Sequence, residues 1–177
     1  MGVFIALYRG INVGGNNPVK METLRAMHEH LGHENVNSYI QSGNIVLRAS
    51  GSPESIARNT AAEFVKEFGF PARIMVVTAK RWRTIVEENP YAKIAAENPK
   101  TVHAGICEGQ PTAKSLEALL TKTGGPEKFT IGQGVIYIHS PEGIGTSKFA
   151  AGMEKACAVP MTMRNWRTVE AISEMVQ

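Results

Sequence analysis

The amino-acid sequence predicts an α+β protein in which the order strand–helix–strand–strand–helix–strand occurs twice, followed by one more helix. Three observations predict it. Short apolar runs rich in β-branched and aromatic residues alternate with longer runs that have helical spacing. Gly and Pro separate these runs where helices are expected to begin or end. The two halves share this order without evident sequence identity, so the duplication rests on the pattern alone.

The first half contains predicted strands at residues 3–9, 36–41, 45–48 and 73–77. The run 3–9 is apolar almost throughout, as in a strand that is buried on both faces. Between the first two strands, Pro18 is placed to open a helix that ends at Gly32. Between the last two strands, Ser52 is the predicted N-cap of a helix that ends at Gly69.

The second half repeats this order, with predicted strands at residues 102–107, 129–131, 135–139 and 161–163. Its two helices are predicted to begin at Pro111 and near Ser147. The stretch Gly132-Gln133-Gly134 between the middle strands is typical of a hairpin turn. Asn165 is the predicted N-cap of the last helix.

The order βαββαβ is that of ferredoxin-like folds. We therefore expect two tandem ferredoxin-like units, one over residues 1–90 and one, with the extra C-terminal helix, over residues 91–177. A helix around Trp82 and a proline-flanked connector over residues 89–100 would join them. The alternative, a single mixed sheet without internal symmetry, stays open at this point.

Composition excludes several classes of protein. The 177 residues are 43% hydrophobic and 20% charged, as expected of a globular protein. No apolar run is long enough to cross a bilayer, and the N-terminus lacks the pattern of a secretion signal, so we expect a cytoplasmic protein without membrane contact. Cys107 and Cys157 form no paired pattern, which predicts free thiols. No metal and no cofactor is predicted.

The charged residues narrow the chemistry further. All 16 acidic residues are glutamate, which disfavours EF-hand loops, Walker-B magnesium ligands and Ser-His-Asp triads together. The net charge of +3 is compatible with an anionic partner but does not require one. The basic residues are scattered, whereas a nucleic-acid binder usually concentrates them.

The strongest local feature is a Gly-rich loop (residues 9–17) between the first strand and a helix N-terminus. Free backbone N–H groups and the positive end of the helix dipole favour an anion there. Gly14 and Gly15 would allow a ligand to approach the backbone, and Arg9 and Lys20 would supply charge. The spacing fits neither a Walker-A loop nor a dinucleotide fingerprint. The alternative is that the glycines are present only because the loop needs positive φ angles, without any ligand.

The predicted strand order brings a second segment to this loop. Because the third strand lies antiparallel between the first two, the first and second strands end at the same edge of the sheet. Gln41, Ser42 and Asn44 should therefore lie beside Arg9 and Asn12. This set has no carboxylate and no histidine, so it suits holding an anion or an amide better than acid/base catalysis.

The same argument brings two loops of the second half together. Ser147 and Lys148 should lie near Arg164 and Asn165, each at the start of a helix. Glu142 is the only carboxylate of this set and its best acid/base candidate. The alternative is that Ser147 and Asn165 are N-caps and nothing more.

Aromatic and histidine side chains on the strands suggest two further hypotheses, RNA binding and metal binding. RNA-recognition modules share this strand order, and Phe4 and Tyr137 are the candidates to stack bases. His103 and His139 are predicted to lie on one sheet face with Tyr137, where packing is favoured over a metal site.

Four motifs occur in order: Arg9 to Gly15, Tyr39 to Asn44, Gly145 to Lys148, and Arg164 to Trp166. With them the chain resembles, nearly end to end, a bacterial family, the domain of unknown function 1697 family. The resemblance implies a duplicated ferredoxin-like α+β fold. It supplies no activity, cofactor or catalytic residue.

Together these features lead us to expect a protein that binds a small phosphate- or carboxylate-bearing molecule at the Gly-rich loop. Whether it is also an enzyme stays open. The alternatives are single-stranded nucleic-acid binding, recognised by a steep dependence on salt, and a protein-interaction module that pairs through exposed strand edges.

Overall fold

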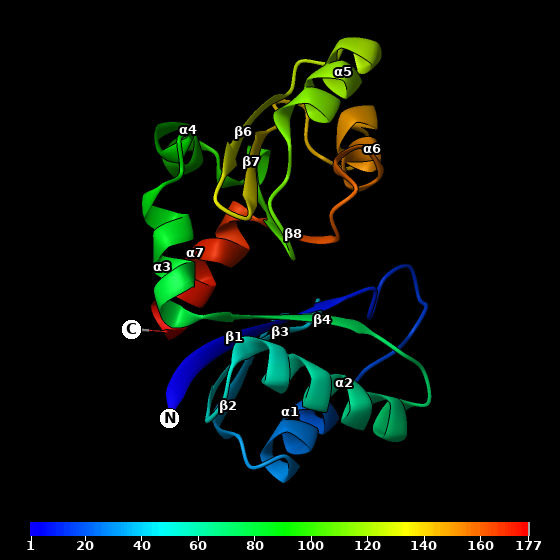
Figure 1. Ribbon diagram of the computed structural model, residues 1–177, viewed down its shortest axis with the longest axis vertical. Helices are drawn as coiled ribbons and strands as arrows, with labels where there is room; N and C mark the ends of the chain where they lie inside the picture. Colours follow the sequence, from blue (N-terminus) through cyan, green and yellow to red (C-terminus); the bar gives the residue numbers. More distant parts are fainter. Residues whose placement is uncertain (177) are drawn as a thin grey trace. The chain divides into compact units, whose positions relative to one another are not determined.

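Two four-stranded antiparallel sheets make up the fold, one in each half of the chain (Figure 1). The structure is a computed structural model that describes residues 1–176. The first unit comprises Met1–Thr84 together with the chain from Ala171 onward, and the second comprises Ile85–Glu170. The predicted α+β fold with two ferredoxin-like units and an extra C-terminal helix is confirmed. How far residues 1–90 and 91–177 act as separate domains stays a prediction.

The first unit consists, in order, of β1 (Gly2–Arg9), α1 (Met21–His30), β2 (Glu34–Tyr39), β3 (Asn44–Ala49), α2 (Pro53–Phe68) and β4 (Arg73–Thr78). The sheet order β2-β3-β1-β4 places β3 antiparallel between β2 and β1. Helices α1 and α2 cover the same face of this sheet (Figure 1). Phe4 and Tyr8 of β1 belong to one buried cluster with Leu24 of α1 and Phe64 of α2.

The second unit repeats this order with α4 (Ala92–Glu97), the short helix η1 (Pro99–Thr101), β5 (Val102–Cys107), α5 (Ala113–Thr123), β6 (Lys128–Gly132), β7 (Val135–His139), α6 (Lys148–Cys157) and β8 (Met161–Asn165). Its sheet order is β6-β7-β5-β8. Leu116 of α5 and Phe149 and Met153 of α6 pack on Ile136 and Ile138 of β7. The predicted connector over residues 89–100 thus contains α4 and the first part of η1.

Two helices contain the boundaries between the units. Helix α3 (Ala79–Glu87) follows β4, and α7 (Trp166–Met175) follows β8 directly. Asn165 caps α7 as predicted, because its Oδ1 accepts a hydrogen bond of 3.1 Å from the N–H of Arg167. Within residues 1–176 no helix is long and apolar enough to span a bilayer.

Of the two helix starts predicted in the first half, the one at Ser52 is confirmed and the one at Pro18 is wrong. Ser52 and Ser55 form a capping box at α2, each hydroxyl oxygen accepting a hydrogen bond from the other residue's N–H. In contrast, α1 begins at Met21 and not at Pro18. Lys20, directly before this helix, is extended, and the N–H and the carbonyl oxygen of Val19 are both bonded to another side chain, described below.

The strand register corrects the expected placement of two histidines. His103 pairs with Ile138, whereas His139 pairs with Val102 and Tyr137 with Ala104. Since directly paired residues point to the same face, His103 lies on the face opposite to His139 and Tyr137. A register offset of one residue is enough to reverse the face of a side chain, and the sequence does not show that offset.

Candidate functional site

The Gly-rich loop is closed by its own hydrogen bonds. The N–H of Asn12 donates to the carbonyl oxygen of Asn17 (3.1 Å), and the N–H of Asn16 donates to that of Val13 (3.0 Å). The side-chain amide of Asn17 donates to the carbonyl oxygen of Gly10 (3.0 Å). Asn12 and Asn17 adopt φ values of 53° and 50°, which Asn tolerates better than most residues. The loop is therefore a defined hairpin.

The side chain of Asn12 joins three segments of the first unit. Its Nδ2 donates to the carbonyl oxygens of Val19 (2.9 Å) and Gln41 (2.8 Å), and its Oδ1 accepts from the N–H of Val19 (2.7 Å). These contacts connect the loop after β1, the entry to α1 and the turn between β2 and β3. We call residues 9–20 and 40–44 the Asn12 cluster. It places the backbone of Gln41 beside Asn12.

Gly43 allows the β2–β3 turn to approach β1. Its carbonyl oxygen accepts a hydrogen bond of 2.8 Å from the N–H of Tyr8. A Cβ atom at Gly43 would lie 2.5 Å from the Cβ of Tyr8 and 2.7 Å from Cδ1 of Ile11, and φ at Gly43 is 77°. Both the space and the backbone conformation therefore require glycine here.

Asn44 closes the same turn from inside. It is fully buried, and its Nδ2 donates to the carbonyl oxygen of Tyr39 (3.1 Å) and to Oγ of Ser42 (3.0 Å). Both of its amide hydrogens thus serve the turn, as both amide hydrogens of Asn12 serve the loop. The polar residues of the cluster that are exposed are Arg9, Asn16, Asn17, Lys20 and Gln41.

The entry to α1 lies within the Asn12 cluster. Lys20 is the N-cap residue, with extended backbone, and no side chain of residues 1–176 caps this helix end. Gly14 and Gly15 are exposed, and no atom lies within 4 Å of a Cβ built on either of them. A helix N-terminus, a lysine and accessible backbone therefore occur together, which is a combination suited to an anion.

A chain of three polar side chains runs through the core of the first unit. The hydroxyl of Tyr8 lies 2.8 Å from Nε2 of His28, and Nδ1 of His28 lies 2.9 Å from Nδ1 of His33. Burial, with the charge on His33 as a smaller cause, lowers the pKa of His28 to about 3. Burial also lowers the pKa of His33 and raises that of Tyr8. All three groups are therefore neutral at pH 7.

The second unit has its own polar site at the start of α6. Ser147 caps this helix, its Oγ accepting a hydrogen bond of 3.0 Å from the N–H of Ala150. The hydroxyl of Ser147 also donates to Oε1 of Glu127, a buried residue that the sequence analysis missed. A cavity of about 200 Å³ is lined by these two residues, by Glu142 and by Lys148. We call it the Glu127 cavity.

The position of Glu127 follows from the sheet topology. It directly precedes β6, and β6 pairs antiparallel with β7 so that Lys128 lies opposite His139. The start of β6 therefore meets the loop that leads from β7 to α6. A search for carboxylates beside that loop in the predicted sheet would have found Glu127 as well as Glu142.

Arg164 and Asn165 are bonded to their own unit. Arg164 is buried, its Nη1 donates to Oγ1 of Thr162 (2.8 Å), and burial lowers its pKa to about 10. Nδ2 of Asn165 donates to the carbonyl oxygen of Lys100 (3.1 Å). Their role in ligand binding stays a prediction.

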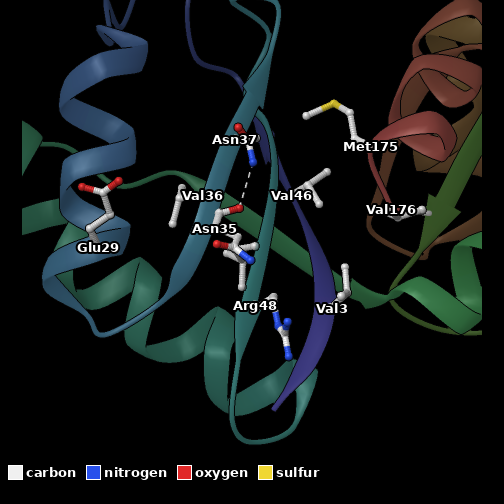
Figure 2. Close-up of a pocket in the computed structure, with 10 residues that line it drawn as sticks. Val3, Glu29, Asn35, Val36, Asn37, Val46, Arg48, Met175 and Val176 are labelled. Carbon is white, nitrogen blue, oxygen red and sulfur yellow. Dashed lines mark hydrogen bonds between the residues drawn. The ribbon is translucent and has the colours of Figure 1, made fainter.

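A groove of about 700 Å³ in the first unit contains none of the predicted site residues (Figure 2). Its walls include Val3, Val46 and Arg48 from the sheet and Met175 from the C-terminal segment. The side-chain amide of Asn37 donates to the carbonyl oxygen of Asn35 (3.0 Å), which is the dashed line in Figure 2. These residues come from separate elements and form no motif, so no sequence pattern indicates the groove.

Comparison with known proteins places the chain in a family. It is similar in structure to the conserved bacterial protein SP0830 from Streptococcus pneumoniae, with a TM-score of 0.69 and 22% identity over 99% of each chain, which shows the fold alone. A search of curated proteins gives no match. Residues 1–137 match the family model described as protein of unknown function (DUF1697), and the chain therefore belongs to this family.

Proposed function

We propose that the protein binds a small molecule by a phosphate or carboxylate group at the Asn12 cluster. The observation that supports this proposal best is the set of three hydrogen bonds made by the Asn12 side chain. They fix the loop, the helix entry and the turn by contacts within the chain. A site that is already ordered loses little conformational freedom when it binds.

The residues of the cluster would divide into two groups. Asn12 and Asn44 position the backbone, because their amide hydrogens are already used within the chain. Arg9 and Lys20 would provide positive charge, and the backbone of Gly14 and Gly15 would provide N–H donors. Gln41 and Ser42 would contact the rest of the ligand.

The carboxylate of Glu22 reduces the positive charge near the proposed site. Glu22 lies in the first turn of α1, where a carboxylate interacts favourably with the helix dipole. The dipole alone is therefore a weak source of affinity here. The proposal accordingly depends on the side-chain charge of Lys20 as well as on the helix end.

The first prediction is that Lys20→Ala weakens phosphate binding about tenfold, as the loss of a charged contact does. Binding is measured by isothermal titration with inorganic phosphate and with phosphorylated small molecules at fixed ionic strength. Lys114→Ala is the matched control, because Lys114 lies exposed in the first turn of α5, a helix that also has no side-chain cap hydrogen bond at its N-cap Thr112. Equal losses in both variants, or no binding of any anion by the wild type, would contradict the proposal.

Single-stranded nucleic acid is the second candidate ligand. Phe4 and Tyr137, the two aromatic candidates for base stacking, are only 6% and 1% exposed. The hydroxyl of Tyr137 donates to the carbonyl oxygen of Ile85 at 2.9 Å. A nucleic-acid ligand would have to bind without these rings. Short oligonucleotides in the same titration, at two salt concentrations, distinguish this candidate by a steep loss of affinity with salt.

A further inference from the structure

We propose a second ligand site at the Glu127 cavity, in which the carboxylate of Glu127 accepts a hydrogen bond from the primary ammonium group of a small molecule. This site belongs to the second unit and uses charge of the opposite sign from the Asn12 cluster. It does not rest on the function proposed above, and either can fail without the other.

The hydrogen bonding of Glu127 is incomplete. Its side chain is 8% exposed, and Oε1 accepts a hydrogen bond from the hydroxyl of Ser147. Oε2 is buried and has no hydrogen-bond partner among residues 1–176. Leaving a charged acceptor buried without a donor is unfavourable, so an incoming N–H group would gain a strong interaction.

Gly125 keeps space for this carboxylate. A Cβ atom built on Gly125 would lie 2.0 Å from Oε2 of Glu127. The backbone of Gly125 is outside the left-handed region, so alanine would fit its backbone conformation. A Cβ at this position would therefore displace the carboxylate, which is the end of a flexible side chain.

The charges around the cavity favour an organic ammonium group. Glu127 and Glu142 contribute two carboxylates, and Lys148 contributes one ammonium group. Within the described residues, no group of three or more His, Cys, Asp or Glu side chains could hold a metal ion. The volume of about 200 Å³ is below that of sites for drug-sized molecules, so the ligand is small. An acceptor at its other end would face Lys148.

The competing explanation is that Glu127 only extends the cap of α6. In that case its negative charge stabilises the positive end of the helix through Ser147, and the cavity holds water. This explanation predicts no preference for amines over neutral molecules of the same size. The two explanations are therefore separated by a titration.

The test uses the full chain, labelled with ¹⁵N and titrated with ethanolamine and glycinamide, with ethylene glycol as the neutral control. Saturable amide shifts are expected at residues 125–127 and 146–150 with the two amines alone. Glu127→Gln should weaken amine binding at least about tenfold, because it replaces the acceptor at Oε2 by a donor.

Two further variants complete the test. Gly125→Ala should weaken amine binding as Glu127→Gln does, because its Cβ displaces the carboxylate. Glu117→Gln removes the same charge from α5, does not line the cavity, and should leave binding unchanged. The proposal is overturned if the wild type shows no saturable amine shifts, if ethylene glycol produces the same shifts, or if Glu127→Gln binds amines as the wild type does.

Discussion

Single residues hold the first unit together where regular backbone pairing ends. Asn12 makes three hydrogen bonds beyond the end of β1, and Gly43 lets the opposite turn come within contact of Tyr8. Neither residue is part of the apolar core. Both are found in the motifs noted in the sequence, which indicates that these motifs encode loop geometry whatever ligand the loops bind.

The close approach at Gly43 predicts a large loss of stability for Gly43→Ala. The new Cβ would overlap the Cβ of Tyr8, which cannot move without the strand, and the left-handed backbone adds strain. We expect a loss of about 3 kcal/mol in the free energy of unfolding, measured by urea denaturation. Gly14→Ala is the control, since it shares the left-handed φ but meets no atom within 4 Å. A loss of similar size in both variants would mean that backbone strain alone explains the effect.

The buried histidine predicts how stability changes with pH. The folded pKa of His28 is about 3, below the ordinary value of 6.5 that applies in the unfolded chain. The unfolded state therefore binds a proton first as the pH falls, and stability declines from about pH 6.5 downward by up to about 1.4 kcal/mol per pH unit. His33 contributes in the same direction.

Denaturation at several pH values between 6.5 and 5 measures this decline before most carboxylates titrate. His28→Gln keeps a polar partner for Tyr8 but does not titrate in this range. Its stability should depend less steeply on pH than that of the wild type. An unchanged slope would show that the pKa of His28 is not lowered in the folded protein.

At the scale of helices and strands, the sequence predicts most where local signals act alone. The strands of both sheets were predicted to within a few residues because turns bound them and several are apolar runs, although β2 is mostly polar. The capping box at Ser52 is equally local. The predicted start of α1 was wrong, and the side chain of Asn12, seven residues before Val19, bonds both the N–H and the carbonyl oxygen of Val19. The helix propensities of the residues around Pro18 do not predict that contact.

The candidate sites likewise have some features that the sequence predicts and others that depend on tertiary contacts. Strand order alone predicts that the Gly-rich loop and the β2–β3 turn lie together, and Asn12 bonds to Gln41 there. It does not predict which side chains have their hydrogen-bond donors occupied within the chain. The amide groups of Asn12 and Asn44 are two such cases. The face of His103 depends on register, which the sequence does not show. Strand order places Glu127 beside the loop before α6, but it does not show that the carboxylate is buried there.

At the scale of the whole molecule, the chain does not divide at a single point. The residues from Ala171 onward group with the first unit, although the preceding part of α7 belongs to the second. Met175 and Val176 line the groove that Val3 and Val46 also line (Figure 2). The first unit is therefore completed by residues that are far from it in sequence.

This arrangement predicts that a change near the C-terminus destabilises the N-terminal sheet. Ile172 is fully buried, and Ile172→Ala should lower the free energy of unfolding by about 2–5 kcal/mol. Glu174→Ala, at an exposed position of the same helix, is the control. Native-state hydrogen exchange locates the effect, because the amides of β1 and β3 should lose protection at least as much as those of β5 and β7. Loss of protection confined to β5 and β7 would show that the end of α7 stabilises the second unit alone, and that the first unit is stable without it.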